Sequence, residues 1–272
     1  MDKLQRNERI AVLMKVLSDS PSKIFTLGSF TEMFGSAKST ISEDLDIVQN
    51  LLNRFELGSI ETIPGAAGGV RFVPSMSVEK VREILSCLCM ELSRKERILS
   101  GSFLYMLDII YNPEKIAQIG RIFAGRFSSC GIDYVITVET KGIPLAFITA
   151  KYLNVPLVIV RHYNEATDGA SVNINYMSGS SNKIQTMVLS LKALKKNSKL
   201  LFIDDFMKGG GTARGIVELA KEFECEVAGI GVLIGTAEPR VKLVENCFSL
   251  LTLYGVNEKN GIIDIRPSTE RV

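Results

Sequence analysis

One stretch in the second half of the chain carries residues whose types and spacing could bind a ligand. The apolar run Leu200 to Ile203 is followed at once by two adjacent carboxylates, Asp204 and Asp205. Three consecutive glycines, Gly209 to Gly211, and Thr212 come next, at the expected start of a helix. Glycine backbone N–H groups and a helix N-terminus bind anions, while carboxylates accept hydrogen bonds from sugar hydroxyls. The stretch therefore predicts a site for a sugar phosphate at the end of a buried strand.

Two commoner phosphate-binding motifs do not fit this stretch. A P-loop needs Gly-Lys-Ser/Thr after four spacer residues, and that pattern is absent. A dinucleotide-binding fingerprint starting at Gly209 needs glycine at position 214, where Arg214 stands. Its acidic residue also follows the glycines instead of preceding them. The remaining alternative is a surface turn whose acids have no function.

The elements that must position these residues follow from hydrophobic periodicity. After about residue 130, short runs rich in Val, Ile and Leu alternate with helical stretches, which is typical of a mostly parallel sheet covered by helices on both faces. In such sheets, ligands bind beyond the carboxyl ends of the strands. The expected strands are 134–138, 156–160, 200–203, 227–234 and 248–253, the expected helices are 143–153 and 212–223, and the segment 78–129 is expected to be largely helical with breaks near Ser93, Asn112-Pro113 and Gly120.

The first 74 residues follow a different pattern. Apolar residues at helical spacing predict a helix around residues 10–17, a short helix over 29–34, and a third helix with an apolar stripe of Ile41, Leu45, Val48 and Leu52. Thr40 and Glu43 are spaced for a capping box at the start of the third helix. Alternating runs at 59–63 and 70–73, joined by a glycine-rich loop, predict a hairpin. This order is that of a winged helix-turn-helix, so we expect a winged-helix domain over 1–74 and an α/β domain over 75–272.

The polar residues of the first domain allow a DNA-binding surface. Small donors at the start of the third helix suit phosphates and base edges, and nearby cations add charge. The domain is not basic overall, because its acidic residues slightly outnumber its basic ones, so the surface must be local. A protein-interaction module has the same order of elements and is the alternative. The candidate DNA-binding residues are Arg6, Arg9, Ser36, Lys38, Ser39, Thr40, Ser42 and Arg71.

Composition excludes several classes of protein. The single histidine, His162, excludes a two-histidine metal site, and its simplest interpretation is a residue at a strand end. Five cysteines without a CxxC pair predict a reduced protein with neither a disulfide framework nor a zinc ribbon. Apolar runs fall short of the roughly 20 residues that span a bilayer. The charged first 20 residues lack a signal-peptide core, so we expect a cytoplasmic protein.

Two motifs resemble those of a known superfamily. Residues 200–215 are similar to the phosphoribosyl pyrophosphate signature of type I phosphoribosyltransferases, and residues 138–146 resemble their pyrophosphate loop. With a winged helix ahead of them, nearly the whole chain, including residues 172–179, resembles the Gram-positive-type purine operon repressors. The resemblance implies a homodimer that binds double-stranded operator DNA upstream of purine biosynthesis genes and represses their transcription. It also implies that phosphoribosyl pyrophosphate acts as inducer by weakening DNA binding.

The resemblance also implies roles for individual residues. The two aspartates would hold the ribose 2′- and 3′-hydroxyls, the loop after them would wrap the 5-phosphate, and residues 140–142 would face the pyrophosphate, with Arg161 adding charge there. Mg²⁺ accompanies this ligand in the enzymes, bound chiefly through the ligand's own oxygens, and purine nucleotides, including the guanosine alarmone, are expected to compete for the site. The implied effector-binding residues are Thr140, Lys141, Gly142, Arg161, Asp204, Asp205, Phe206, Met207, Lys208, Gly209, Gly210, Gly211 and Thr212.

Two departures from catalytic phosphoribosyltransferases favour a binding domain without turnover. Catalysis needs a closing loop that brings cations to the leaving pyrophosphate. Residues 162–182 occupy that position and contain Glu165 and Asp168 but no lysine or arginine. Lys208 stands where catalytic sequences more often carry a small residue. We therefore predict no enzyme activity. The alternatives are an active purine phosphoribosyltransferase with an N-terminal accessory domain, a repressor that senses a nucleotide, and an RNA-binding antiterminator, against which the Ser/Thr-rich recognition helix argues.

Overall fold

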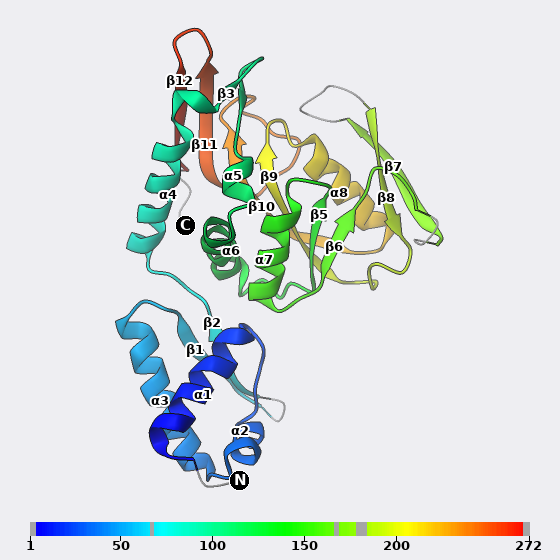
Figure 1. The fold of residues 1–272 in the computed structure, drawn as a ribbon. Helices are drawn as coiled ribbons and strands as arrows, with labels where there is room; N and C mark the ends of the chain where they lie inside the picture. The colour runs from blue at the N-terminus through cyan, green and yellow to red at the C-terminus, as the bar shows by residue number, and fades with distance from the viewer. Residues whose placement is uncertain (1–3, 66–67, 166–168, 178–183, 269–272) are drawn as a thin grey trace. The chain divides into compact units, whose positions relative to one another are not determined.

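A computed structural model describes residues 4–65, 68–165, 169–177 and 184–268 of the chain. The chain divides into two compact units (Figure 1). The first unit comprises Met1–Ser77 together with Lys151–Asn154, and the second comprises Val78–Ala150 and Val155–Val272. Within the described residues, no helix is both long and apolar enough to cross a membrane.

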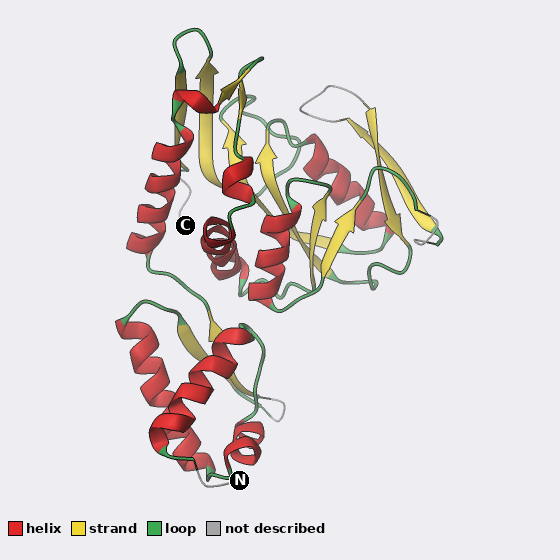
Figure 2. Ribbon diagram, in the orientation of Figure 1, coloured by secondary structure: helices red, strands yellow, loops and turns green. Residues whose placement is uncertain are grey.

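The first unit consists of three helices followed by a two-stranded antiparallel sheet (Figure 2). This order confirms the predicted winged helix-turn-helix fold. The apolar stripe predicted on the third helix is buried against side chains of the other two helices, among them Leu13, Leu17 and Phe30. The elements are α1 (Arg6–Asp19), α2 (Leu27–Phe34), α3 (Lys38–Arg54), β1 (Ser59–Ile63) and β2 (Gly69–Val73).

The start of α3 differs from the prediction. The helix begins at Lys38 with Ala37 as its N-cap residue and no side-chain cap. Thr40 is thus the third residue of the helix, so the predicted capping box with Glu43 is wrong. Gly35, which ends α2, has a left-handed backbone (φ 59°) that a glycine adopts at little cost. The turn made there lets α3 start earlier and places Lys38 in its exposed first turn.

The second unit is built around a six-stranded sheet in the order β12-β11-β10-β9-β5-β6. All neighbouring strands are parallel except the edge strand β12, which pairs antiparallel with β11. This topology confirms the predicted mostly parallel sheet. The strands are β5 (Tyr134–Val138), β6 (Leu157–Val160), β9 (Lys199–Met207), β10 (Glu226–Thr236), β11 (Cys247–Asn257) and β12 (Ile262–Pro267).

Helices cover both faces of this sheet. On one face, Leu200 and Phe202 of β9 belong to a buried cluster with residues of α8 (Gly211–Glu222). On the other face, the rings of Phe123 and Phe127 from α6 (Pro113–Phe127) lie close to the backbone of β10. Glycines of β10 make this approach possible, since a Cβ at Gly231 would lie 2.8 Å from the Phe123 ring. Alternation along the strands therefore divides the core into two layers.

Several elements of the second unit depart from the predicted pattern. In the segment 78–129, the predicted breaks near Ser93 and Asn112-Pro113 are present, but the one near Gly120 is wrong, because α6 continues through it. A small hairpin with Gly101 in a left-handed conformation (φ 83°) adds an interruption that was not predicted. Its strands have only two residues each, too few to show an alternating pattern. The elements of this segment before α6 are α4 (Val78–Leu92), a 3₁₀ turn (Lys95–Arg97), β3 (Ile98–Leu99), β4 (Phe103–Leu104) and α5 (Leu107–Ile110). The unit is completed by α7 (Ile143–Leu153) and by a second hairpin of β7 (Ser171–Met177) and β8 (Ile184–Ser190).

Candidate functional site

A cavity of about 620 Å³ opens where the carboxyl ends of β5 and β9 lie side by side in the sheet. Both of the motifs found in the sequence reach it. Thr140 and Lys141 come from the turn after β5, and Asp204, Asp205 and Thr212 come from the end of β9 and the start of α8. The volume is in the range of small-molecule sites, roughly 300–1,000 Å³.

The two aspartates belong to β9 itself, which continues to Met207 beyond the predicted end at Ile203. Asp205 is buried and its backbone N–H donates to Asp204 Oδ1 at 2.9 Å. Burial raises the pKa of Asp204 well above its ordinary range, and the neighbouring Asp205 carboxylate raises it further. Because the pKa of Asp204 is raised in the folded state, its contribution to stability is present at low pH and is lost as the pH rises. Ionisation of Asp204 at neutral pH therefore costs folding free energy. Hydroxyl donors or a cation brought by a ligand would offset that cost.

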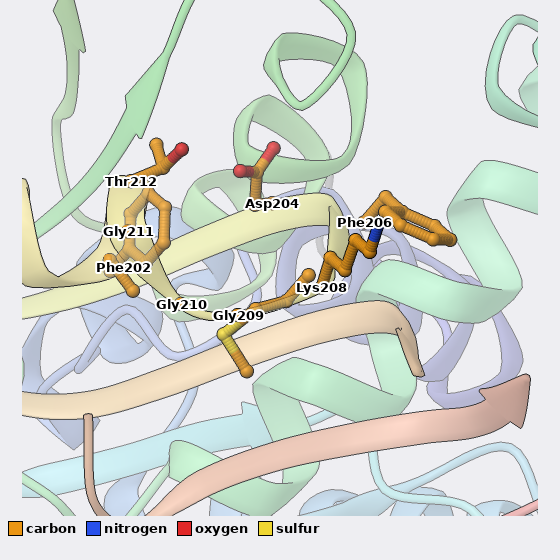
Figure 3. A pocket seen from close by; sticks show the side chains of 10 residues that line it. Phe202, Asp204, Phe206, Lys208, Gly209, Gly210, Gly211 and Thr212 are labelled. Atoms are coloured by element: carbon orange, nitrogen blue, oxygen red, sulfur yellow. The ribbon is translucent and has the colours of Figure 1, made fainter. Parts of the chain in front are cut away.

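The loop after β9 forms a hollow of its own, lined by Phe202, Asp204 and residues 206–213. Gly210 is the N-cap residue of α8 and has a left-handed backbone (φ 84°). In Figure 3 the Asp204 carboxylate and the Thr212 hydroxyl point to the same side of the loop. Met207 differs from its neighbours because its side chain is buried in the core, so only its backbone is available to a ligand.

The turn after β5 packs directly against the acidic pair. A Cβ added to Gly142 would come within 2.6 Å of Asp204 Oδ1 and 2.7 Å of Thr137 Oγ1. Only a glycine fits at this distance without a shift of its neighbours. The peptide bond between Glu139 and Thr140 is cis. The two motifs, more than 60 residues apart in the sequence, are thus in contact in the folded chain.

Arg161 and His162 follow β6 but have different surroundings. The Arg161 guanidinium pairs with Glu165, Nη1 to Oε1 at 2.8 Å, and is not among the residues that line the cavity in the described chain. His162 does line it. The His162 Nδ1 lies 3.0 Å from the Thr186 carbonyl oxygen. A carbonyl can only accept, so Nδ1 carries the proton. His162, interpreted from the sequence as a strand-end residue, therefore belongs to the site, as the shared edge of β5 and β6 could have indicated.

The two hairpins supply cavity residues that sequence reasoning missed. Phe103 comes from β4, and Tyr176 and Gln185 come from β7 and β8. The Tyr176 hydroxyl donates to Gln185 Oε1 at 2.7 Å, and burial raises the pKa of the Tyr176 phenol. It is therefore a neutral donor at physiological pH. Nothing in the local sequence indicates which cavity a two-stranded hairpin will border.

The predicted DNA-binding residues of the first unit do not form one group. Lys38, Ser39 and Ser42 are exposed on the first turns of α3, and Ser36 and Thr40 are half-buried nearby. Lys38 and Ser42 line a groove of about 610 Å³ between α3 and the β1–β2 hairpin. The Gln49 side chain links these two elements, since its Oε1 accepts from the Ile60 N–H at 2.6 Å.

The three arginines among the predicted DNA-binding residues pair with acids instead. Arg9 is only 7% exposed, and its Nε donates to Asp44 Oδ2 at 2.8 Å. In this position Arg9 has a structural role and little surface to offer DNA, and its DNA contact stays a prediction. Arg6 remains exposed, with Nε 3.2 Å from Asp44 Oδ1. Arg71 on the hairpin donates twice to Glu61 Oε2, at 2.9 and 2.7 Å. Their charges are partly neutralised within the unit.

Comparison with known proteins agrees with this division of the chain. Residues 5–74 match the family model for the N-terminal domain of the bacterial purine repressor. Residues 106–264 match the model for the phosphoribosyl transferase domain. The chain resembles the adenine phosphoribosyltransferase of Thermoanaerobacter pseudethanolicus (16% identity, TM-score 0.53), a match that covers 65% of this chain and 99% of that one. At this identity the likeness concerns the fold of the second unit alone.

Full-length relatives share both domains. The chain is 45% identical to the purine biosynthesis transcriptional repressor PurR of Bacillus subtilis (strain 168), over 97% of this chain and 93% of that protein. It is 36% identical to the purine biosynthesis transcriptional activator PurR of Lactococcus lactis subsp. lactis (strain IL1403), over 97% of each. Proteins with this architecture thus include regulators of either sign.

Proposed function

The chain belongs to the bacterial purine repressor family, and from this premise we propose that it is a cytoplasmic repressor that binds operator DNA upstream of purine biosynthesis genes. The higher identity to a repressor than to an activator supports the sign of this regulation. A homodimer is part of the proposal, because a two-fold symmetric protein matches the symmetry of paired half-sites on DNA. The exposed first turns of α3, with Lys38, Ser39 and Ser42, are the surface proposed to meet the DNA.

Phosphoribosyl pyrophosphate is the proposed inducer. The observation that carries this is the contact between the two motifs, where the Gly142 backbone lies against the Asp204 carboxylate at one cavity. Asp204 and Asp205 can accept from two neighbouring sugar hydroxyls, and the loop from Phe206 to Thr212 can enclose a phosphate. Lys141, which lines the same cavity, is proposed to meet a second anionic group of the same ligand.

Mg²⁺ is proposed to accompany the inducer, held chiefly through the ligand's own oxygens. Its charge, brought to the cavity with the pyrophosphate, would favour the ionised form of Asp204, whose pKa burial raises. Purine nucleotides, including a guanosine alarmone, carry a ribose and phosphates of the same chemistry. They are therefore proposed to compete with the inducer for the cavity. Their proposed effect on DNA binding comes only from keeping the inducer out.

The cavity is proposed to bind without turnover. In the part of the chain that the structure describes, the Lys and Arg residues lining it are Lys141 and Lys208. Glu165, in the position of the enzymes' closing loop, pairs with Arg161. A leaving pyrophosphate needs positive charge that arrives with the closing loop. The described residues of this segment bring an acid, which supports recognition of the ligand and opposes its cleavage.

Fluorescence anisotropy on a labelled fragment from upstream of the host's purine genes tests the proposal. Protein is titrated with and without phosphoribosyl pyrophosphate and Mg²⁺. The proposal predicts tight, salt-sensitive binding that the ligand weakens at least about tenfold, or about 1.4 kcal/mol of coupling. Tight DNA binding that the ligand does not change would support the repressor function and reject phosphoribosyl pyrophosphate as its inducer. Affinity no greater than for a random fragment would reject the repressor.

An active purine phosphoribosyltransferase is the second candidate, favoured by the fold likeness that covers 99% of an adenine phosphoribosyltransferase. Pyrophosphate release from phosphoribosyl pyrophosphate and a purine base distinguishes it from the proposed function. The proposal predicts no base-dependent release above the rate without protein. Release that requires both the base and Asp205 would establish catalysis instead.

A further inference from the structure

The segment between β10 and β11, residues 237–246, lies against the loop proposed to bind the 5-phosphate. The Lys242 ammonium donates to the Lys208 carbonyl oxygen at 2.6 Å. The Leu243 backbone N–H donates to the Gly209 carbonyl oxygen at 2.9 Å. We propose that Lys242 is a positioning residue that holds this loop in its anion-binding shape. The inference rests on the proposed function, because it concerns the same ligand.

The two hydrogen bonds fix the direction of the loop's peptide groups. In a trans peptide the C=O and the following N–H point in opposite directions. Fixing the carbonyls of Lys208 and Gly209 toward residues 242–243 turns the N–H groups of Gly209 and Gly210 away from them. The hollow enclosed by the loop has no lining residue from 237–246 in the described chain. The N–H groups of the loop and the first turn of α8 are thereby available to a phosphate.

Three oxygens surround the Lys242 ammonium. Besides the Lys208 carbonyl, it donates to the Thr236 carbonyl at 2.7 Å and to Thr236 Oγ1 at 3.2 Å. The Thr236 hydroxyl proton has two acceptors within reach, the Glu238 carbonyl at 2.6 Å and the Lys208 carbonyl at 3.2 Å, and its lone pairs accept from Lys242. Burial lowers the pKa of Lys242, as expected for a cation taken partly out of water. Without this cation, the Lys208 carbonyl would keep only the longer contact to the Thr236 hydroxyl, at 3.2 Å, whose proton has a closer acceptor in the Glu238 carbonyl.

The close approach continues at Gly210. A Cβ added there would lie 3.3 Å from Val244 Cγ2 and 3.4 Å from the Leu243 nitrogen. The segment therefore contacts the loop along consecutive residues, 208 to 210, on the side away from the hollow. A loop of three glycines has high conformational freedom when it is not held. The Lys242 ammonium binds the carbonyl of Lys208, the first residue after β9, and so restrains the loop where it begins.

Calorimetry with three probes tests the inference. Ribose 5-phosphate carries the 5-phosphate and the sugar hydroxyls, pyrophosphate with Mg²⁺ lacks both, and phosphoribosyl pyrophosphate with Mg²⁺ carries all groups. Lys242→Met is expected to lower the affinity for ribose 5-phosphate and for phosphoribosyl pyrophosphate at least about tenfold, the effect of one charged hydrogen bond. The affinity for pyrophosphate is expected to stay unchanged. Lys242→Arg, which keeps donors for the same oxygens, is expected to recover most of the affinity.

Arg240→Met is the matched control, because Arg240 lies in the same segment, pairs with Glu238 in solvent and has a side chain that is 90% exposed. It removes the same charge and is expected to leave all three affinities unchanged. Should Lys242→Met fail to fold, Lys242→Gln replaces it with the same expected selectivity.

The outcomes separate this inference from the proposed function. A wild-type protein that binds ribose 5-phosphate and phosphoribosyl pyrophosphate, together with an unaffected Lys242 variant, overturns the inference alone. Equal weakening of all three probes also overturns it, because a general loss of structure would do that. A wild-type protein that binds neither sugar phosphate overturns the proposed inducer and this inference with it.

Discussion

The cavity of the second unit and the predicted DNA surface of the first unit use their charged side chains in opposite ways. In the second unit, carboxylates and two lysines from separate motifs gather at one cavity, and the pKa of the Asp204 carboxyl is raised. In the first unit, Arg9 and Arg71 pair with acids of the same unit. The difference shows that a motif at the ends of parallel strands predicts a site well, because the topology brings strand ends together. Cations on a helix predict a DNA contact poorly, since their partners decide their role.

The arginine on α1 illustrates the second half of this comparison. Arg9 and Asp44 are both buried, and each charge is compensated mainly by the other. Such a pair is costly to break, because the remaining partner is left charged in a poorly solvated place. The surface that remains for DNA consists of Lys38, the hydroxyls near it, and the partly neutralised Arg6 and Arg71. The contrast therefore predicts that loss of Arg9 and loss of Lys38 weaken DNA binding for different reasons.

The largest expected effect is that of Arg9→Ala. The variant leaves the buried Asp44 with only the exposed Arg6 as a charge partner, and the free energy of unfolding of the first unit should fall by as much as about 3–5 kcal/mol. Urea unfolding followed by circular dichroism measures this loss. The double variant Arg9→Met with Asp44→Leu removes both charges and should recover most of the stability. A single variant with wild-type stability and weakened DNA binding would show that Arg9 contacts DNA after all.

The second expected effect is that of Asp204→Ala with Asp205→Ala. Hydrogen bonds to charged acceptors contribute about 1.5–3 kcal/mol each, so affinity for phosphoribosyl pyrophosphate should fall about 100-fold or more. Affinity for operator DNA should stay unchanged, since the proposed DNA surface belongs to the other unit. Anisotropy and calorimetry on the same preparation measure the two affinities. Parallel loss of both, with an intact thermal transition, would contradict the separation of roles.

Gly142→Ala should have an intermediate effect. The added methyl group meets Asp204 and Thr137 at distances shorter than normal contact. The neighbours must shift, and overpacking of this kind costs about 1–3 kcal/mol. We expect weaker binding of phosphoribosyl pyrophosphate together with a lower melting temperature of the second unit. Gly125→Ala is the matched control, because a Cβ there has no atom within 4 Å. Equal behaviour of the two variants would contradict the close packing of the two motifs.

The smallest expected effects are those on the DNA surface. Lys38→Ala should weaken operator binding by about 1 kcal/mol and reduce the salt slope by about one. Arg71→Ala should have less effect, because Glu61 already neutralises part of its charge. Glu61→Gln, which frees the Arg71 guanidinium, should strengthen binding. Salt titrations of anisotropy measure all three. An unchanged slope in Lys38→Ala would remove the start of α3 from the DNA surface.

Much of the fold follows from the sequence because periodicity is a local property. The strand 134–138 and the helix 143–153 have the predicted bounds. The strand β9 was predicted too short, since two aspartates are poor strand residues and only pairing with β10 carries the strand on to Met207. The hairpins β3–β4 and β7–β8 were not predicted, and neither was their place at the cavity. Their position depends on tertiary contacts that no local pattern encodes.

The role of Arg9 could have been predicted from spacing. Arg9 stands four residues before Leu13 and eight before Leu17, on the apolar stripe of its helix. Asp44 likewise lies between Ile41 and Val48 on the buried stripe of α3. Opposite charges on two facing apolar stripes indicate a buried pair. The ion pair of Arg161 with Glu165 is less predictable, since it depends on how the chain turns after β6.

In the proposed function, the cavity of the second unit controls DNA binding by the first. Reciprocal linkage tests it most directly: phosphoribosyl pyrophosphate with Mg²⁺ is titrated into the protein by calorimetry, with and without saturating operator DNA. Operator DNA is expected to lower the affinity for the ligand by the same factor by which the ligand lowers the affinity for DNA, at least about tenfold. A ligand affinity that is identical in the free protein and in the DNA complex would contradict it.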